Sequence, residues 1–282
     1  MMCALRATAF RSPNASANHA NRRKRNCMPT LNDAFASARS HRRTLVFGHR
    51  GACGYAPMNT LPSFEKVLEL GADGTEFDVR LTKDRQMIIL HDPTVDDTTN
   101  GHGEVCDLTL AEVRELDAGA WFGETFRGTR IPTLDEVLET LGKRILINIE
   151  IKAENFDQTG VEAMVADAIA RHSIADLTIV SSFNPITLRR FHQAAPQIPI
   201  GYLHHPAEPF FLNDFMRDLP HQARNPHHSE VTPRYRAWSA ANGWTMNVYT
   251  VNDPALAQRL HGIGVDSVIS DVPDVIMSVL RD

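Results

Sequence analysis

The feature that most restricts the fold of this chain is an alternation of short β-branched segments with helical segments, which starts at Leu45 and continues to the C-terminus. About eight strand candidates take part, and this pattern favours a closed (β/α)8 TIM barrel of the α/β class. An open doubly wound sheet is the alternative. It should carry a glycine-rich phosphate-binding turn after its first strand, and residues 48–57 match that motif poorly. The strand candidates are residues 45–49, 75–81, 145–152, 177–183, 198–203, 245–251 and 264–270, with one weak strand at most within 205–235.

The alternation is interrupted after the second strand. Residues 86–92 follow a short turn, so we expect them to form a hairpin arm against strand 75–81. Residues 92–131 are rich in turn-forming residues and contain a capping-box spacing at Thr109 and Glu112, which predicts a short helix. We interpret this stretch as a small inserted subdomain that packs over one end of the barrel. For its aromatic residues Trp121, Phe122 and Phe126, contact with a substrate is one alternative, and we favour the other, that they form its small core.

Residues 1–43 form a basic N-terminal tail, which we expect to be disordered, and residues 44–282 form the barrel domain. The tail carries nine Lys and Arg residues and one acid, which leaves 20 bases and 33 acids for residues 44–282, a net charge of −13. An acidic body does not suit nucleic acid, and no apolar run is long enough for stable membrane insertion. The tail has the composition of an organelle transit peptide. We favour the alternative that translation starts at Met28 in a cytoplasmic protein.

Strand 75–81 places two carboxylates on one face, because side chains alternate between the two faces of a strand and Glu76 and Asp78 are two residues apart. The later strand that contains Glu150 repeats this pattern, with Lys152 on the same face as Glu150. Three acids that converge at one end of a barrel are the ligands that a hard divalent cation requires. We therefore predict a Mg²⁺ or Ca²⁺ site at these acids. The structural alternative is that salt bridges neutralise each acid, for example Glu150 by Lys152.

Two histidines stand at strand ends, where the side chains of a TIM barrel line the active site. His49, followed by Arg50, ends the first strand, and His91 ends the hairpin arm. Histidine can accept and return a proton near neutral pH, so the pair is a candidate for acid–base chemistry. The remaining histidines, which we expect to be exposed and to have no role other than lining the mouth of the site, include His204, His205, His227 and His228.

Together these residues resemble the glycerophosphodiester phosphodiesterase family. The resemblance runs from about Leu45 to the C-terminus, in the family's order and spacing. Each motif alone is a weak signal, but their joint occurrence is specific. The fold that the resemblance implies is a (β/α)8 barrel with a small inserted subdomain after the second strand region. The matching segments include GHRG at 48–51, EFD at 76–78, HD at 91–92, EIK at 150–152, VYTVND at 248–253 and GVDSVISD at 264–271.

The resemblance implies metal-dependent hydrolysis of glycerophosphodiesters to sn-glycerol 3-phosphate and an alcohol. The site residues that it implies are His49 and His91 as the acid–base pair, Glu76, Asp78 and Glu150 as metal ligands, and Arg50, Lys152, Asn59 and Tyr249 as substrate-binding residues. In the first step we assign the base to His49 and the acid to His91.

Met58 departs from the family pattern, because family members usually carry Glu at this position of a Pro-Glu-Asn-Thr segment. Methionine cannot accept a charge-assisted hydrogen bond or bind a hard cation, so we expect weaker metal binding or a displaced Arg50. A catalytically weak or silent barrel that binds glycerophosphodiesters is therefore an alternative function. A lysophospholipase D-like phosphodiesterase is a second alternative, although the sequence shows no amphipathic membrane-binding helix.

Overall fold

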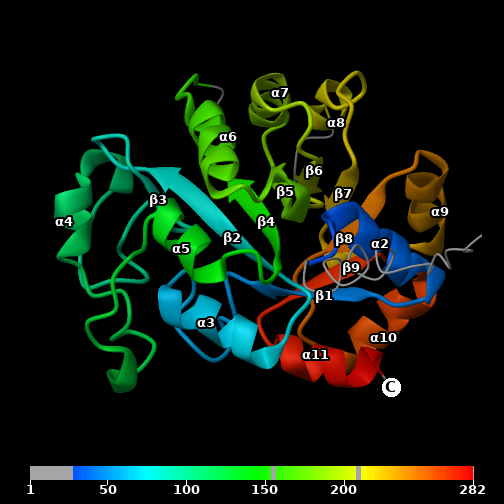
Figure 1. Cartoon of the computed structure of the whole chain (residues 1–282), viewed down its shortest axis with the longest axis horizontal. Coiled ribbons are helices and arrows are strands. Elements are labelled where there is room, and N and C mark those ends of the chain that lie inside the picture. Colours follow the sequence, from blue (N-terminus) through cyan, green and yellow to red (C-terminus); the bar gives the residue numbers. More distant parts are fainter. Residues whose placement is uncertain (1–27, 154–156, 208–210, 282) are drawn as a thin grey trace, which may run out of the picture.

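The fold is a closed barrel of eight parallel strands, as a computed structural model of residues 28–153, 157–207 and 211–281 shows. Neighbouring strands follow the order β1-β9-β8-β7-β6-β5-β4-β2, and pairing of β1 with β2 closes the circle. Helices surround this barrel (Figure 1). The predicted TIM barrel is confirmed, including the weak strand in 205–235. The strands are β1 Leu45–His49, β2 Gly74–Leu81, β4 Leu146–Ile151, β5 Thr178–Ser182, β6 Ile200–His204, β7 Ala223–Pro226, β8 Thr245–Val248 and β9 Ser267–Ser270.

Local capping signals determine where several of the outer helices begin and end. Gly71 ends α3 in the left-handed conformation, at φ 70°, which glycine adopts without steric cost. Thr133 and Glu136 form a reciprocal capping box at the start of α5. Within the described ranges, no helix is both long and apolar enough to cross a membrane. The outer helices are α3 Leu61–Leu70, α5 Leu134–Leu141, α6 Val161–His172, α7 Pro185–Ala194, α8 Leu212–Phe215, α9 Pro233–Ala241, α10 Pro254–Ile263 and α11 Pro273–Leu280, with 3₁₀ turns η4 Ala175–Leu177 and η5 His228–Glu230.

The inserted subdomain lies to one side of the barrel around α4 (Figure 1). Strand β3, Met87–Ile89, pairs antiparallel with β2, which confirms the predicted hairpin arm. Helix α4, Leu110–Arg114, starts at the predicted capping box, and 3₁₀ turns η2, Val105–Asp107, and η3, Glu124–Phe126, flank it. The core of the subdomain is aliphatic and consists of Ile88, Leu90, Val95, Val105, Val113, Ala118 and Ile131.

The aromatic residues of the subdomain form a surface cluster, so our expectation that they make its core is wrong. The ring of Phe122 makes edge-to-face contacts with Trp121 and Phe126, at centroid distances of 5.6 and 5.4 Å. Trp121 is 42% exposed. The aliphatic side chains fill the small interior, which leaves the larger rings at its edge.

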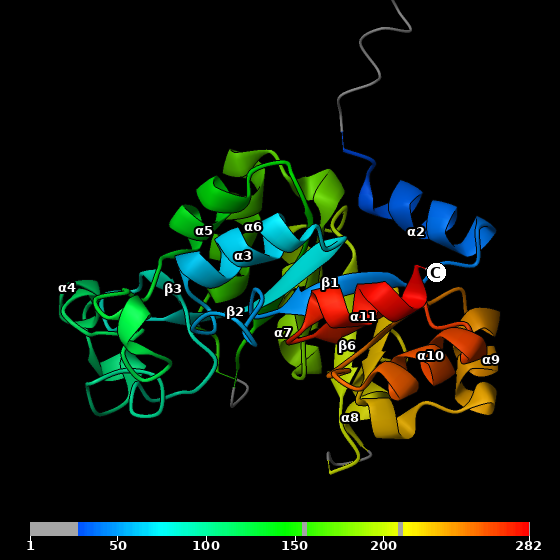
Figure 2. The same ribbon diagram turned by 90° about the horizontal axis from the view of Figure 1, so that it is seen from below.

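The expected disorder of the tail is wrong for its second half, while residues 1–27 lie outside the described residues. Helix α2, Leu31–Ser40, buries Leu31, Phe35 and Ala38 among the inward side chains at the N-terminal end of the barrel strands. Arg39 adds an ion pair to Asp266, at 2.6 Å. This apolar stripe has helical spacing and covers one end of the barrel. Figure 2 shows α2 alongside the barrel, near the C-terminus.

The docking of α2 predicts a large effect of Phe35→Ala on stability. Phe35 is 5% exposed, and truncation of a buried Phe to Ala costs about 3–5 kcal/mol of unfolding free energy. Ser37→Ala, on the exposed side of the same helix, should change it by less than about 0.5 kcal/mol. Denaturant unfolding monitored by circular dichroism measures both values. Equal denaturant concentrations at the unfolding midpoint for the two variants would show that α2 does not dock on the barrel.

Candidate active site

Three buried carboxylates meet at the carboxyl end of the barrel. Glu76 and Asp78 project from β2 and Glu150 projects from β4, and one carboxylate oxygen of each lies within 4.8 Å of the others. The register of the sheet explains this meeting, because Asp78 pairs directly with Glu150 across β2 and β4. Their exposed fractions are only 4%, 1% and 6%. The structure therefore brings the three predicted metal ligands together.

Two cations compensate these acids in part. The Lys152 ammonium lies 3.0 Å from Asp78 Oδ1 and 2.6 Å from Glu150 Oε1. Arg50 Nε lies 3.4 Å from Asp78 Oδ2, although it is not aligned for a hydrogen bond. Asp78 thus contacts both cations, Glu150 contacts Lys152, and Glu76 receives a backbone N–H from Arg50 at 3.3 Å.

The pKa values reflect this uneven compensation. Burial, with added repulsion from Asp78 and Glu150, raises the pKa of Glu76 well above its ordinary value. Burial raises the pKa of Glu150 to about 7, against the attraction of Lys152. Burial also opposes ionisation of Asp78, but Lys152 and Arg50 outweigh it and hold the pKa of Asp78 below its ordinary value. The two cations therefore do not fully compensate the three carboxylates.

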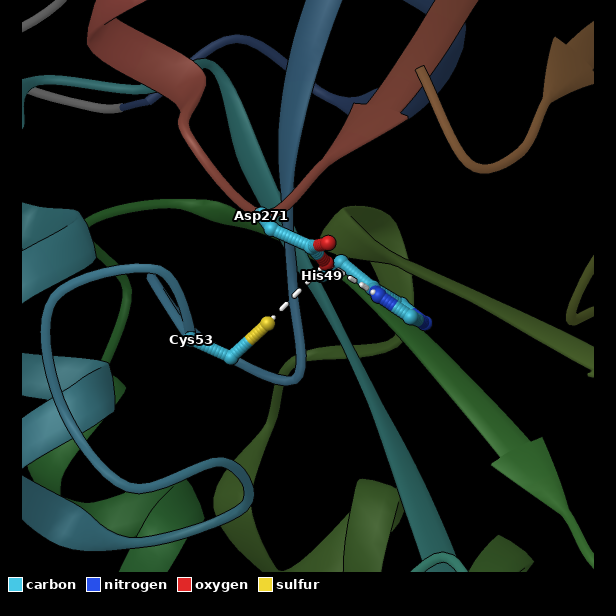
Figure 3. Close-up of side chains that lie close together, drawn as sticks. All are labelled: His49, Cys53 and Asp271. Carbon is cyan, nitrogen blue, oxygen red and sulfur yellow. Dashed lines mark hydrogen bonds and ion pairs between the residues drawn. The ribbon is translucent and has the colours of Figure 1, made fainter. Parts of the chain in front are cut away.

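His49 is held by a carboxylate from the last strand's end (Figure 3). Its Nδ1 lies 2.6 Å from Asp271 Oδ1, and its Nε2 lies 3.9 Å from Glu76 Oε2. Cys53 Sγ donates to the same Asp271 oxygen at 3.0 Å, and Asn252 Nδ2 donates to the other at 2.5 Å. Burial lowers the pKa of His49, so its imidazole is neutral near pH 7. A neutral ring that donates from Nδ1 to Asp271 leaves the Nε2 lone pair for the carboxylate side of the site.

His91 lines a small cavity together with His49, and this cavity has a volume of about 130 Å³. Its Nδ1 lies 2.8 Å from Asp92 Oδ1, and Arg80 donates to its backbone oxygen at 2.6 and 2.9 Å. Burial lowers the pKa of His91 as well. The two imidazoles are therefore each oriented by a carboxylate.

Four side chains were predicted to bind substrate, and three of them line this cavity: Arg50, Lys152 and Tyr249. The Tyr249 hydroxyl donates to the His204 backbone oxygen at 2.9 Å, and its ring meets Phe183 edge to face. Asn59 is placed differently. It is 3% exposed and donates to Asp78 Oδ2 at 2.8 Å, so it holds this carboxylate by a hydrogen bond and does not line the cavity.

Met58 contacts the arginine that we expected it to disturb. The Arg50 guanidinium donates from Nη1 to Met58 Sδ at 3.1 Å, and its Nε is buried without a hydrogen-bond partner among the described residues. A thioether sulfur is a weak hydrogen-bond acceptor, so Met58 holds the Arg50 guanidinium less firmly than a carboxylate at the same position would.

Sequence reasoning missed Asp271, Asn252 and Cys53. Asp271 and Asn252 lie in the two C-terminal segments that match the family, but no role was assigned to them. Asp271 directly follows β9, so the rule that strand ends carry the chemistry of a barrel was a usable signal. Cys53 carried no comparable signal, because its contact with Asp271 spans 218 residues.

The raised pKa of Glu150 predicts how stability depends on pH. Between about pH 4.5 and 7 the folded protein holds a proton on Glu150 that the unfolded chain releases, so the unfolding free energy falls as the pH rises through this range. Glu150→Gln has no proton to release, so it removes this pH-dependent fall of the unfolding free energy. In EDTA, the stability of the variant relative to wild type should rise by up to about 3 kcal/mol from pH 4.5 to pH 7.5.

Urea unfolding at several pH values measures this difference. Glu162→Gln, at a buried acid of α6 outside the cluster, is the matched control. A stability difference for Glu150→Gln that stays constant with pH would contradict the proposed repulsion among the three carboxylates.

Comparison with known proteins gives consistent results. The model of the Glycerophosphoryl diester phosphodiesterase family matches residues 49–275. A glycerophosphodiester phosphodiesterase of Caldanaerobacter subterraneus is 40% identical over 242 residues, which cover 85% of this chain and 98% of that protein. A glycerophosphodiester phosphodiesterase of Bacillus subtilis is 33% identical and covers 85% of this chain and 87% of that protein.

Solved structures share the fold as well as the sequence. A phosphodiesterase of Oleispira antarctica, in complex with the product sn-glycerol-3-phosphate, has a TM-score of 0.78 and 31% identity over 86% of this chain and 99% of that chain. A glycerophosphodiester phosphodiesterase of Agrobacterium tumefaciens has a TM-score of 0.71 and 29% identity, over 83% of this chain and 99% of that chain. The chain therefore belongs to the glycerophosphoryl diester phosphodiesterase family.

Proposed function

We propose that this protein hydrolyses glycerophosphodiesters to sn-glycerol 3-phosphate and an alcohol, with a divalent cation and two histidines. The observation that carries the proposal is the meeting of three buried carboxylates with His49 and His91 at one small cavity. The names of the relatives and the product bound to the Oleispira enzyme support the same substrate class.

The chemistry of the acid cluster fits a hard cation such as Mg²⁺ or Ca²⁺. Three carboxylates face the two cations Lys152 and Arg50, and burial together with mutual repulsion raises the pKa of Glu76. All three groups offer oxygen ligands, which hard cations prefer. When bound there, a divalent cation would polarise a phosphoryl oxygen and neutralise negative charge that develops on it.

His49 is the proposed base of the first step. Asp271 holds Nδ1, so Nε2 can take the proton of the attacking hydroxyl, and the carboxylate stabilises the imidazolium that forms. His91 is the proposed acid and delivers a proton to the oxygen of the departing alcohol. The approaching phosphodiester anion favours the protonated form that this role requires.

The attacking hydroxyl is proposed to be the 2-hydroxyl of the substrate's own glycerol. Its oxygen bonds to phosphorus, the bond to the alcohol breaks, and a cyclic phosphate results. Water then opens the ring with the two histidines in reversed roles, which gives sn-glycerol 3-phosphate. Detection of the cyclic phosphate by ³¹P NMR during turnover tests this route, and its absence under every trapping condition would favour direct attack by water.

Arg50 and Lys152 are proposed to hold the phosphate oxygens. The Asp78 and Glu150 carboxylates outweigh burial and raise the pKa of Lys152, so its ammonium stays charged. Lys152 contacts the two acids with two of its three N–H donors, so the third remains for the substrate.

Asp271 is proposed to act through His49, as a positioning residue.

Assays with glycerophosphocholine and glycerophosphoethanolamine test the activity. We expect turnover that EDTA abolishes and that Mg²⁺ or Ca²⁺ restores. His49→Ala should lower kcat by at least about a hundredfold, and Asp271→Asn should lower kcat more than it changes KM. His102→Ala, at a side chain that is 87% exposed on the insertion, is the matched control and should leave turnover unchanged. Turnover that persists in EDTA or in His49→Ala would refute the proposal.

A barrel that binds glycerophosphodiesters with little turnover is a second candidate, which the contact of Met58 with Arg50 favours. Met58→Glu supplies a carboxylate that can hold Arg50, so kcat/KM at limiting metal should rise about tenfold. Met58→Leu keeps the size of the side chain without a charge and serves as control. Equal kcat/KM for both variants would remove Met58 as the cause of weak activity.

The aromatic cluster of exposed Trp121 with half-buried Phe122 and Phe126 favours a third substrate class, lysophospholipids, because an acyl chain needs an apolar approach surface. Lysophosphatidylcholine therefore belongs in the substrate panel. Faster turnover of lysophosphatidylcholine than of glycerophosphocholine, lost in Trp121→Ala, would replace the glycerophosphodiester assignment by this one.

A further inference from the structure

A cavity of about 700 Å³ lies outside the barrel wall, between strands β6 and β7 and helices α8 and α9. It is separate from the candidate active site, because successive residues of β6 face opposite ways: Leu203 lines the catalytic cavity and His204 lines this one. Helix α8 is only four residues long, whereas α9 next to it has nine, so the helical layer is thin at this point. Our expectation that His204 is exposed is therefore wrong, since packing under α9 leaves it 8% exposed.

Arg224 on β7 lies in the wall of this cavity and is 5% exposed. It donates to Asn213 Oδ1 at 2.9 Å and to His221 Nε2 at 3.1 Å. Burial lowers the pKa of His221 to about 4, so both acceptors are neutral. In the part of the chain that the structure describes, no carboxylate forms an ion pair with Arg224. A buried charge without a counter-charge is costly, and an anion in the cavity would remove that cost.

Aromatic rings surround the same guanidinium. Its central carbon lies 4.9 Å from the ring centroid of Trp244, 5.2 Å from that of Tyr202 and 5.6 Å from that of Trp238. These contacts orient the planar group and favour its charged form. Trp238 is 45% exposed and also lines the cavity, and Tyr235 stacks on its ring at a centroid distance of 5.5 Å, so the part of the ring that stays exposed is the apolar surface that it offers to a ligand.

The other charged groups of the cavity have partners of their own. Asp214 and Arg217 form an ion pair at 2.8 Å on the exposed rim. The Glu230 carboxylate receives a hydrogen bond from His204 Nδ1 at 2.8 Å, and the Tyr235 hydroxyl lies 2.7 Å from His204 Nε2. Asn213 and His221 use two of the five N–H donors of Arg224, and the remaining donors can bind a carboxylate.

We propose that this cavity binds an aromatic carboxylate, with the carboxylate paired to Arg224 and the ring against Trp238. The guanidinium supplies the charge and the planar donor geometry that a carboxylate matches, and the tryptophan supplies the surface that a flat ring covers. The site is independent of phosphodiester hydrolysis, because none of its residues lines the catalytic cavity.

Isothermal titration of the full chain with 2-naphthoate and with 2-naphthamide tests the proposal, because the two probes share a ring system and differ in charge. We expect 2-naphthoate to bind at least about tenfold more tightly than the amide. Arg224→Met, which keeps an apolar chain of similar length among the rings, should weaken 2-naphthoate binding by at least about tenfold. Arg217→Ala, at the exposed rim of the same cavity, is the matched control and should change it less than about twofold.

Trp238→Ala provides an independent variant, because its ring is partly exposed and its loss should weaken both probes without unfolding the protein. Circular dichroism verifies the fold of each variant, and glycerophosphocholine turnover by Arg224→Met should equal that of wild type. Equal binding of the two probes, retained 2-naphthoate binding in Arg224→Met, no binding of 2-naphthoate at millimolar concentration, or competition of 2-naphthoate with glycerophosphocholine would each overturn the proposal.

Discussion

The pairing of two barrel strands places three carboxylates close together, and the contacts of the site compensate the repulsion among them. Pairing of β2 with β4 sets Asp78 beside Glu150, and Glu76 follows one pleat away on the same face. Asp78 contacts both Lys152 and Arg50, and Glu150 contacts Lys152, so two cations face three carboxylates. A protein that only needed a stable barrel would fill these positions with apolar side chains. The three buried acids are therefore consistent with the divalent-cation site proposed above.

Supporting contacts orient the groups around this cluster. Asn59 holds Asp78 from behind, and Asp271, itself held by Asn252, fixes the His49 ring. These contacts matter because a proton acceptor works only when its lone pair faces the proton that it takes. Arg50 is the weakest part of the arrangement, since its partner at position 58 is a thioether sulfur. The same barrel thus combines a histidine held by a carboxylate with an arginine held by a thioether and a more distant carboxylate.

The two ends and the outer wall of the barrel differ in the side chains that they carry. Helix α2 covers the N-terminal end with an apolar stripe, while the proposed chemistry occupies the opposite end. Helix α8 in the outer wall is only four residues long, and beside it the chain places Arg224 among aromatic rings instead of an apolar side chain. A family resemblance could not indicate this second cavity, because it depends on how α8 and α9 pack over β6 and β7.

The sequence by itself determined the alternation of strands and helices, the capping boxes at Thr109 and Thr133, and the shared face of Glu76 and Asp78. These features are local, because strand periodicity and capping depend on residues within a few positions of one another. Tertiary structure alone decided the rest: that α2 docks, that His204 is buried, that Trp121 is exposed, and that Asp271 holds a histidine 222 residues away. Burial and long-range contacts depend on which surfaces of the folded chain meet, and only the closed barrel brings those surfaces together.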